Sequence, residues 1–238
     1  MLKSLVDSSV FLRVVEVIDH RSENRISEFG MLAQAFEFVK INGLDGDYFE
    51  FGLWRGKTFC CARNMARRYR VEGITFRGFD SFEGLPTTTE TRYSIWSKGQ
   101  FACTRDELER ILQRKGFTKR QYQLVDGFYE KSLTPQLTSS LLSIGVKAAI
   151  VYIDCDLYES TRLVLDFINP FLQDGTVICF DDFFAFRGRP DMGEQRALRE
   201  FLVANPQVIL NPYLVYGSLG MSFICSLRLN DHGPSSGC

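Results

Sequence analysis

The sequence predicts an α/β domain built around a mostly parallel sheet with helices on both faces. From residue 47 onward, short apolar runs alternate with amphipathic helical segments, which is the pattern of consecutive βα units. The run at 148–153 is apolar throughout, as expected of a parallel strand buried on both faces. A length of 238 residues with a 45% apolar fraction suits one such domain, and neither a linker nor an internal repeat divides the chain.

The first half of the chain is predicted to supply three strands. Residues 1–28 carry apolar side chains at roughly helical spacing, so we expect a helical extension before the main domain at 29–230. Ser27 is expected to cap a helix at 28–42, which Gly43 ends. The next expected elements are a strand at 48–51, a helix at 57–69, a strand at 74–79, a helix at 105–115 and a strand at 122–125.

The second half continues this alternation and then closes the sheet. The runs at 207–210 and 219–229 have no helical pattern between them, so we expect two antiparallel strands at the sheet edge. Residues 231–238 are expected to be a flexible tail. The elements before these strands are a helix at 133–143, a strand at 148–153, a helix at 159–168, a strand at 176–180, a polar loop at 188–193 and a helix at 194–203.

The segment 87–100 has no clear period and separates two βα units. Irregular loops of this length inside a compact domain are usually functional or disordered. We therefore expect this segment to be a lid that covers the site together with the N-terminal helices.

The first βα turn has the features of a nucleotide-binding unit. Glu50 ends the strand, Gly52 opens a turn, and Gly56 precedes the helix. Glycine lets the backbone approach a ligand closely because it has no Cβ. The complete G-x-G-x-x-G pattern is missing, which argues against a dinucleotide, and a plain turn would explain the same residues.

Carboxylates follow every predicted parallel strand. They are Glu50, Asp80, Asp126, Asp154 with Asp156, and Asp181 with Asp182. Asp154 and Asp181 end consecutive strands, which lie about 5 Å apart if they are neighbours. Repulsion between them would be relieved by a hard divalent cation such as Mg²⁺ or Ca²⁺. The alternative is that Asp156 caps a helix and Asp182 is solvated.

Asp80 stands where an acid typically accepts hydrogen bonds from ribose hydroxyls. A nucleoside without phosphates would fit beside such an acid and Gly52. Its base could pack on an aromatic wall, although each candidate could equally belong to the core. The candidates are Phe82, Trp96 and Phe128.

Composition narrows the function classes. The formal net charge of −1 argues against a nucleic-acid partner, and without a run of about 18 apolar residues no membrane span is expected. No apolar signal segment occurs at the N-terminus, and seven cysteines lack metal-like spacing, so we expect a reducing cytoplasm. His20 and His232 lie near the ends, which argues against Ser-His-Asp or histidine-based zinc chemistry. The N-terminal helices could pair in a homodimer.

Four blocks of sequence resemble the macrocin O-methyltransferase (TylF/MycF-like) family in order and spacing. They are Phe49–Gly56, Phe79–Pro86, Asp154–Thr161 and Asp181–Phe183. The resemblance covers roughly residues 29–205, and Cys155 departs from it where a glycine or another small residue is usual. It implies a three-layer methyltransferase fold with strand order 3-2-1-4-5-7-6 and strand 7 antiparallel. It also implies S-adenosylmethionine- and Mg²⁺-dependent O-methylation of a sugar, glycan or glycosylated natural product.

The resemblance also implies residue roles. Glu50 and Gly52 would face the methionine part of the cofactor, and Asp80 and Ser81 the ribose. The complete expected cofactor set is Glu50, Gly52, Trp54, Gly56, Asp80, Ser81, Phe82, Asp126, Gly127, Phe128 and Asp154. The expected metal ligands are Asp154, Asp181 and Asp182, and the expected general base is Asp154 or Asp156.

Two other functions fit parts of the sequence. Asp154-Cys155-Asp156 matches the D-x-D tripeptide of metal-dependent glycosyltransferases, although that match leaves the turn at Gly52 unexplained. The chain could also bind the cofactor without turnover, although the retained acids argue against this.

Overall fold

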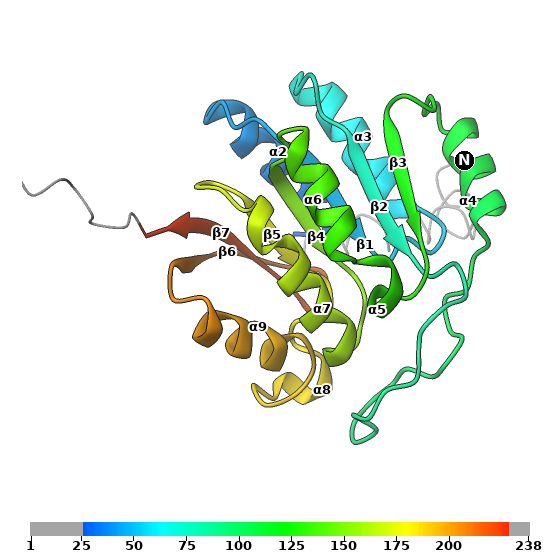
Figure 1. The fold of residues 1–238 in the computed structure, drawn as a ribbon, viewed down its shortest axis with the longest axis vertical. Coiled ribbons are helices and arrows are strands. Elements are labelled where there is room, and N and C mark those ends of the chain that lie inside the picture. Colours follow the sequence, from blue (N-terminus) through cyan, green and yellow to red (C-terminus); the bar gives the residue numbers. More distant parts are fainter. Residues whose placement is uncertain (1–25, 229–238) are drawn as a thin grey trace, which may run out of the picture.

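A computed structural model of the chain describes residues 26–228 (Figure 1). Its seven-stranded sheet has the order β3-β2-β1-β4-β5-β7-β6, in which β7 runs antiparallel to both neighbours. This confirms the predicted fold. The strands are β1 Asp47–Phe51, β2 Phe76–Asp80, β3 Tyr122–Asp126, β4 Ala148–Ile153, β5 Val177–Phe180, β6 Val208–Tyr216 and β7 Gly220–Leu227.

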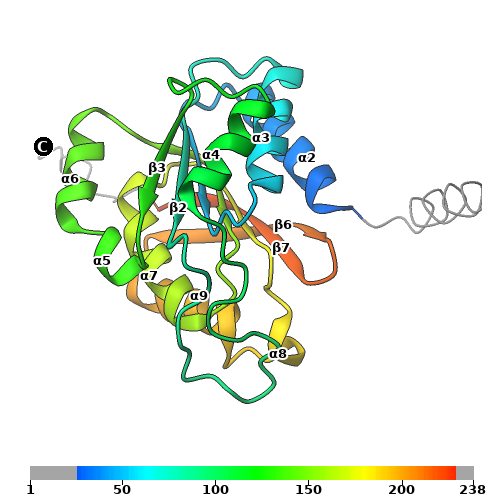
Figure 2. The ribbon, with the colours of Figure 1, turned by 90° about the vertical axis from the view of Figure 1, so that its right-hand side faces the viewer.

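Helices cover both faces of the sheet, so the molecule has three layers (Figure 2). One core lies under α2 Glu28–Ile41, α3 Lys57–Tyr69 and α4 Arg105–Arg114. The other lies under α6 Pro135–Ser143, α7 Tyr158–Ile168 and α9 Gly193–Ala204. The remaining short helices are α5 Tyr129–Ser132, η1 Asn169–Phe171 and α8 Ala185–Gly188.

The pleat of β1 explains how one strand serves both cores. Tyr48 faces the core under α2 and α3, while Phe49 and Phe51 face the opposite core. Every residue of β1 is buried, as is every residue of β2, β4 and β5. Strands buried on both faces need mostly apolar side chains, which is why β4 and β5 appear in the sequence as continuous apolar runs.

Most elements lie within two residues of their expected bounds, and the notable differences concern β6, α6, α5 and α8. β6 extends to Tyr216 because it is an edge strand, where Pro212 is tolerated beside a register shift. The helix expected at 133–143 begins at Pro135, since Thr134 caps it and proline suits the first turn. The short helices α5 and α8 were not expected, because four residues are too few to show a helical period.

Several expectations concern residues that the structure does not describe. The N-terminal helical extension and the predicted homodimer contact rest mainly on residues 1–25, and the predicted tail lies within 229–238. Within 26–228, no helix combines the length and apolar character needed to cross a bilayer. The six cysteines of this part of the chain are free thiols.

Candidate active site

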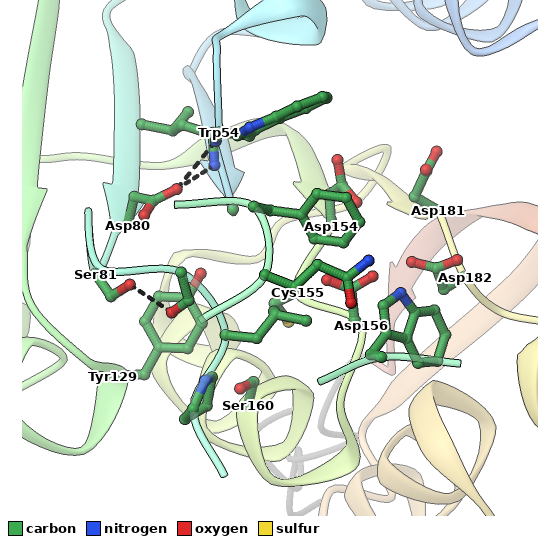
Figure 3. Close-up of a pocket in the computed structure, with 18 of the residues that line it drawn as sticks. Trp54, Asp80, Ser81, Tyr129, Asp154, Cys155, Asp156, Ser160, Asp181 and Asp182 are labelled. Atoms are coloured by element: carbon green, nitrogen blue, oxygen red, sulfur yellow. Dashed lines mark hydrogen bonds between the residues drawn. The ribbon is translucent and has the colours of Figure 1, made fainter. Parts of the chain in front are cut away.

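A cavity of about 330 Å³ opens where β1, β2, β4 and β5 end (Figure 3). Asp80 and Ser81 lie at one side, and four aspartates from the ends of β4 and β5 lie at the other. The segment 84–101 forms the roof, with Leu85, Pro86, Trp96, Gln100 and Phe101 among the lining residues. The expected lid therefore borders the cavity.

Gly52 lets the backbone at the end of β1 approach the end of β4 closely. Its φ is +85°, and a Cβ at this position would lie 1.8 Å from the carbonyl oxygen of Asp154. The two strand ends are joined by a hydrogen bond of 2.8 Å from the Asp154 N–H to the Phe51 carbonyl. No side chain fits between these backbones, so glycine is required here.

Asp80 organises this turn from the end of β2. Its Oδ2 accepts from the N–H groups of Leu53 at 2.6 Å and Trp54 at 3.1 Å, and its Oδ1 accepts from Phe82 N–H at 2.7 Å. Burial raises the pKa of Asp80, and these backbone donors oppose that shift. Trp54 adopts a left-handed φ of 42°, and its ring packs edge-on against Phe101 of the roof. The turn and the roof therefore meet over the cavity.

The structure brings about half of the expected cofactor residues to the cavity wall. Those that line it are Gly52, Trp54, Asp80, Ser81, Phe128 and Asp154. Those that do not are Glu50, Gly56, Phe82, Asp126 and Gly127. Gly56 precedes α3, where a Cβ would lie 2.8 Å from Leu108, and Asp126 forms an exposed ion pair with Arg105.

Glu50 lies in the protein interior next to the cavity. Its carboxylate accepts hydrogen bonds from the hydroxyls of Tyr48 and Thr58, the latter at 2.6 Å. Burial, opposed by these hydrogen bonds, raises the pKa of Glu50 to about 8. Glu50 and Tyr48 are two residues apart in β1 and so share a face of the sheet, which explains why Glu50 points toward α3.

Three carboxylates converge at the other side of the cavity. One oxygen from each of Asp154, Asp156 and Asp182 lies within 4.8 Å of the others. β4 and β5 are neighbours, as expected, and Asp156 reaches the group through a left-handed backbone with a φ of 61°. Asp181 also lines the cavity, but its carboxylate accepts a hydrogen bond from the Tyr152 hydroxyl. The acid cluster, Asp154, Asp156 and Asp182, thus has Asp156 where the sequence suggested Asp181.

Burial and mutual repulsion make this cluster electrostatically costly. Burial raises the pKa of Asp156 to about 6, and burial with repulsion from Asp156 raises that of Asp182 to about 9. The pKa of Asp154 is also raised well above its ordinary value, by burial and by repulsion from Asp181. A cation offsets such repulsion, and an all-oxygen donor set fits Mg²⁺ or Ca²⁺.

The charge of the cavity is strongly one-sided. Among the described residues that line it, Lys57 carries the single positive charge, and it pairs with Glu28 at 3.0 Å. The lining carboxylates are Glu28, Asp80, Glu130, Asp154, Asp156, Asp181 and Asp182. Such a cavity suits a positively charged ligand and disfavours a diphosphate.

Sequence reasoning did not predict the contacts that Tyr152, Glu90 and Glu194 make around this site. Tyr152 lies in an otherwise apolar run near the end of β4. Its hydroxyl is the feature of the sequence that could have indicated a contact with Asp181. Glu194 is 1% exposed, and its Oε2 accepts from the N–H of Asp182 at 3.2 Å. Glu90 is far from Gly193 in sequence, and only the fold brings these two residues into contact, next to Glu194.

The profile of the Macrocin-O-methyltransferase (TylF) family matches residues 23–203, which is more than half of the chain. A tetracenomycin-type 4'-O-methyltransferase of Streptomyces olivaceus is 26% identical over 159 residues, covering 64% of this chain and 58% of that enzyme. Mycinamicin III 3''-O-methyltransferase of Micromonospora griseorubida is 24% identical over 161 residues, covering 64% of this chain and 61% of that enzyme. The matched part thus spans about three fifths of these relatives.

Solved structures share the fold. The O-methyltransferase NovP superposes with a TM-score of 0.67 at 22% identity, covering 84% of this chain and 79% of NovP. The calicheamicin methyltransferase CalS11 gives a TM-score of 0.68 at 21% identity, covering 94% of this chain and 89% of CalS11. At these identities the likeness shows the architecture.

Proposed function

We propose that this chain, which belongs to the macrocin-O-methyltransferase (TylF) family, transfers a methyl group from S-adenosylmethionine to a sugar hydroxyl. The observation that carries the proposal is one cavity with the Gly52 turn at one side and the acid cluster at the other. The substrate class is suggested by the relatives, whose names describe methylation of glycosylated natural products. The acceptor would be a sugar, a glycan or such a glycoside.

The turn side of the cavity would hold the cofactor. Gly52 and Trp54 would border its methionine part, and Asp80 with Ser81 would contact the ribose through the acceptor positions that the turn leaves open. Phe128 would provide a wall for the adenine. The bound cofactor would supply an activated methyl group, so the residues around it need mainly to position it.

The acid cluster would hold a divalent cation and bind the acceptor hydroxyl. The residues fit this role because three carboxylates, one buried and two half-buried, converge without a balancing positive charge among the described lining residues. A cation held there would lower the pKa of a hydroxyl beside it. An oxygen of Asp154 or Asp156 would accept the hydroxyl proton. The acceptor oxygen would then attack the methyl group as the bond between methyl and sulfur breaks, and S-adenosylhomocysteine would leave.

The glycosyltransferase alternative is disfavoured. A nucleotide sugar carries a diphosphate, while the described lining residues carry seven carboxylates and one paired lysine. The family match also favours methyl transfer. We therefore interpret Asp154-Cys155-Asp156 as part of the acid cluster.

The proposal is tested with labelled S-adenosylmethionine, Mg²⁺ and a panel of glycoside acceptors. We expect methyl transfer that EDTA abolishes, and calorimetric binding of S-adenosylhomocysteine that survives in Asp154→Asn. Cofactor binding without transfer to any acceptor would indicate a non-catalytic protein. Sugar transfer from a nucleotide sugar would overturn the proposal.

Calorimetric titration with Mg²⁺ separates the two possible metal sets. Asp156→Asn should weaken Mg²⁺ binding by at least about tenfold, since Asp156 contributes an oxygen to the converging group. Asp181→Asn should weaken it less, because the Asp181 carboxylate already accepts from Tyr152. A larger loss in Asp181→Asn would instead support the set predicted from sequence.

A further inference from the structure

Glu90, in the roof segment 84–101, is buried against a distant helix. Glu90 is 9% exposed, and its Oε2 accepts a hydrogen bond from the N–H of Gly193 at 2.8 Å. Its Oε1 lies 3.4 Å from a guanidinium nitrogen of Arg196. The first turn of α9 is thus held by a residue 103 positions earlier in the chain.

The next residue of α9 faces the acid cluster. Glu194 accepts from the Asp182 N–H through Oε2, while its buried Oε1 has no hydrogen-bond partner within 26–228. Leaving a buried carboxylate oxygen unpaired is costly, so the hydrogen bond from the Asp182 N–H is the polar contact that fixes the Glu194 side chain among the described residues. Gly193 and Glu194 therefore connect the roof with Asp182.

The roof, and not the residue that precedes α9, supplies the side-chain cap of this helix. Met192, at the cap position of α9, makes no side-chain capping bond, and the cap comes from the roof instead. Gly193 has a φ of +55°, and a Cβ there would lie 2.7 Å from the ring of Phe186, which itself packs on Trp96 of the roof. Roof, α9 and cluster therefore form one contiguous packed unit.

We propose that Glu90 and Glu194 are positioning residues that couple closure of the roof to placement of Asp182 in the acid cluster. The proposal rests on the proposed function only in assigning a divalent cation to that cluster. A cation that fixes Asp182 stabilises α9 in the place where Glu90 holds it, so cation binding and roof closure strengthen each other. Such coupling is reciprocal by thermodynamic necessity.

The test measures Mn²⁺ affinity of the full chain by calorimetry without cofactor or acceptor. We expect Glu90→Ala and Glu194→Ala each to weaken Mn²⁺ binding by about five- to tenfold. Glu90→Gln and Glu194→Gln should recover part of the loss, because the amide oxygen still accepts the backbone N–H. Thr91→Ala, an exposed neighbour in the roof, and Glu37→Gln, an exposed carboxylate on α2, are matched controls that should bind as the parent chain does.

Trypsin provides the reciprocal readout. Arg92 and Lys98 are cleavage sites inside the roof segment. Mn²⁺ should slow cleavage there in the parent chain and in Thr91→Ala, but not in Glu90→Ala. The Gln variants keep the test decisive if an Ala variant fails to fold.

The outcomes separate this proposal from the proposed function. Glu90 and Glu194 variants that fold and bind Mn²⁺ like the parent chain would overturn the coupling, even if the parent transfers methyl groups. Absence of Mn²⁺ binding by the parent would overturn it as well. Coupled Mn²⁺ binding in a chain that methylates no acceptor would support the coupling and contradict the function.

Discussion

Three residues of the site depend on a left-handed backbone conformation. Gly52, Trp54 and Asp156 all have left-handed φ values, and each lies in the cavity wall. A non-glycine residue in this region costs roughly 1–2 kcal/mol, which the surrounding contacts must offset. Asp80 supplies such contacts for Trp54, and the close approach of the β1 and β4 strand ends requires Gly52.

Gly52→Ala should be severely destabilising. The added Cβ would meet the Asp154 carbonyl oxygen at 1.8 Å, so the strand ends must separate, at a cost of more than about 3 kcal/mol. Binding of S-adenosylhomocysteine should be lost with it. Urea unfolding and calorimetry would measure both effects.

Gly43→Ala is the matched control. Gly43 also has a positive φ, of +61°, but nothing lies within 4 Å of its added Cβ. We expect a cost of only about 1 kcal/mol, from the backbone conformation. Equal stability of the two variants would show that the close approach at Gly52 does not constrain the fold.

Among the elements, the roof segment is held by contacts with α7 and α8, in addition to the contact of Glu90 with α9. Glu159, in the first turn of α7, accepts hydrogen bonds from Thr88 Oγ1 at 3.0 Å and from Thr89 N–H and Oγ1 at 2.8 and 2.6 Å. Trp96 packs on Phe186 of α8. An irregular segment without strand or helix pairing is thus ordered by contacts that are distant in sequence.

Glu159→Ala should loosen this roof. If losing these hydrogen bonds destabilises the ordered roof by roughly 1.4 kcal/mol, the KM for the acceptor should rise about tenfold. The affinity for S-adenosylhomocysteine should change little. Asp166→Ala, which removes an exposed carboxylate from the same helix, should leave KM unchanged. If Glu159→Ala left acceptor KM intact, the roof would not be needed to bind the acceptor.

On the scale of the whole molecule, buried acids link stability to pH. The pKa of Glu50 is raised to about 8 in the folded protein, against 4.5 for the ordinary side chain. Between these two pH values, Glu50 keeps its proton in the folded chain and loses it in the unfolded chain. The contribution of Glu50 to the free energy of unfolding therefore falls as pH rises. Asp156 and Asp182, with raised pKa values, act in the same direction when no cation is present.

Between pH 5 and 8, without divalent cations, the free energy of unfolding should fall with rising pH. Glu50 contributes up to about 1.4 kcal/mol per pH unit to this slope. Glutamine resembles the protonated side chain, so Glu50→Gln should remove the contribution of Glu50, which is up to one proton, from the pH dependence of the unfolding free energy. Denaturant titrations over this range would measure it, and an unchanged slope in Glu50→Gln would show that Glu50 is ionised throughout.

The local sequence pattern predicted the α/β class, most element bounds and the acids at the strand ends. These features depend on apolar periodicity and strand length, which residues close together in the sequence determine. The order of the strands came from the family resemblance, since no local pattern specifies which strands pair. Pro212 concealed most of β6, because only an edge position makes a proline acceptable within a strand.

Tertiary structure decided which of the predicted acids meet. The pleat turns Glu50 under α3, Arg105 engages Asp126 outside the cavity, and a left-handed backbone brings Asp156 beside Asp154. The direction of a side chain at a strand end depends on backbone dihedrals and packing partners that lie far away in sequence. For the same reason the contact of Glu90 with Gly193 has no trace in the local pattern, although it ties the roof to the carboxylates below it.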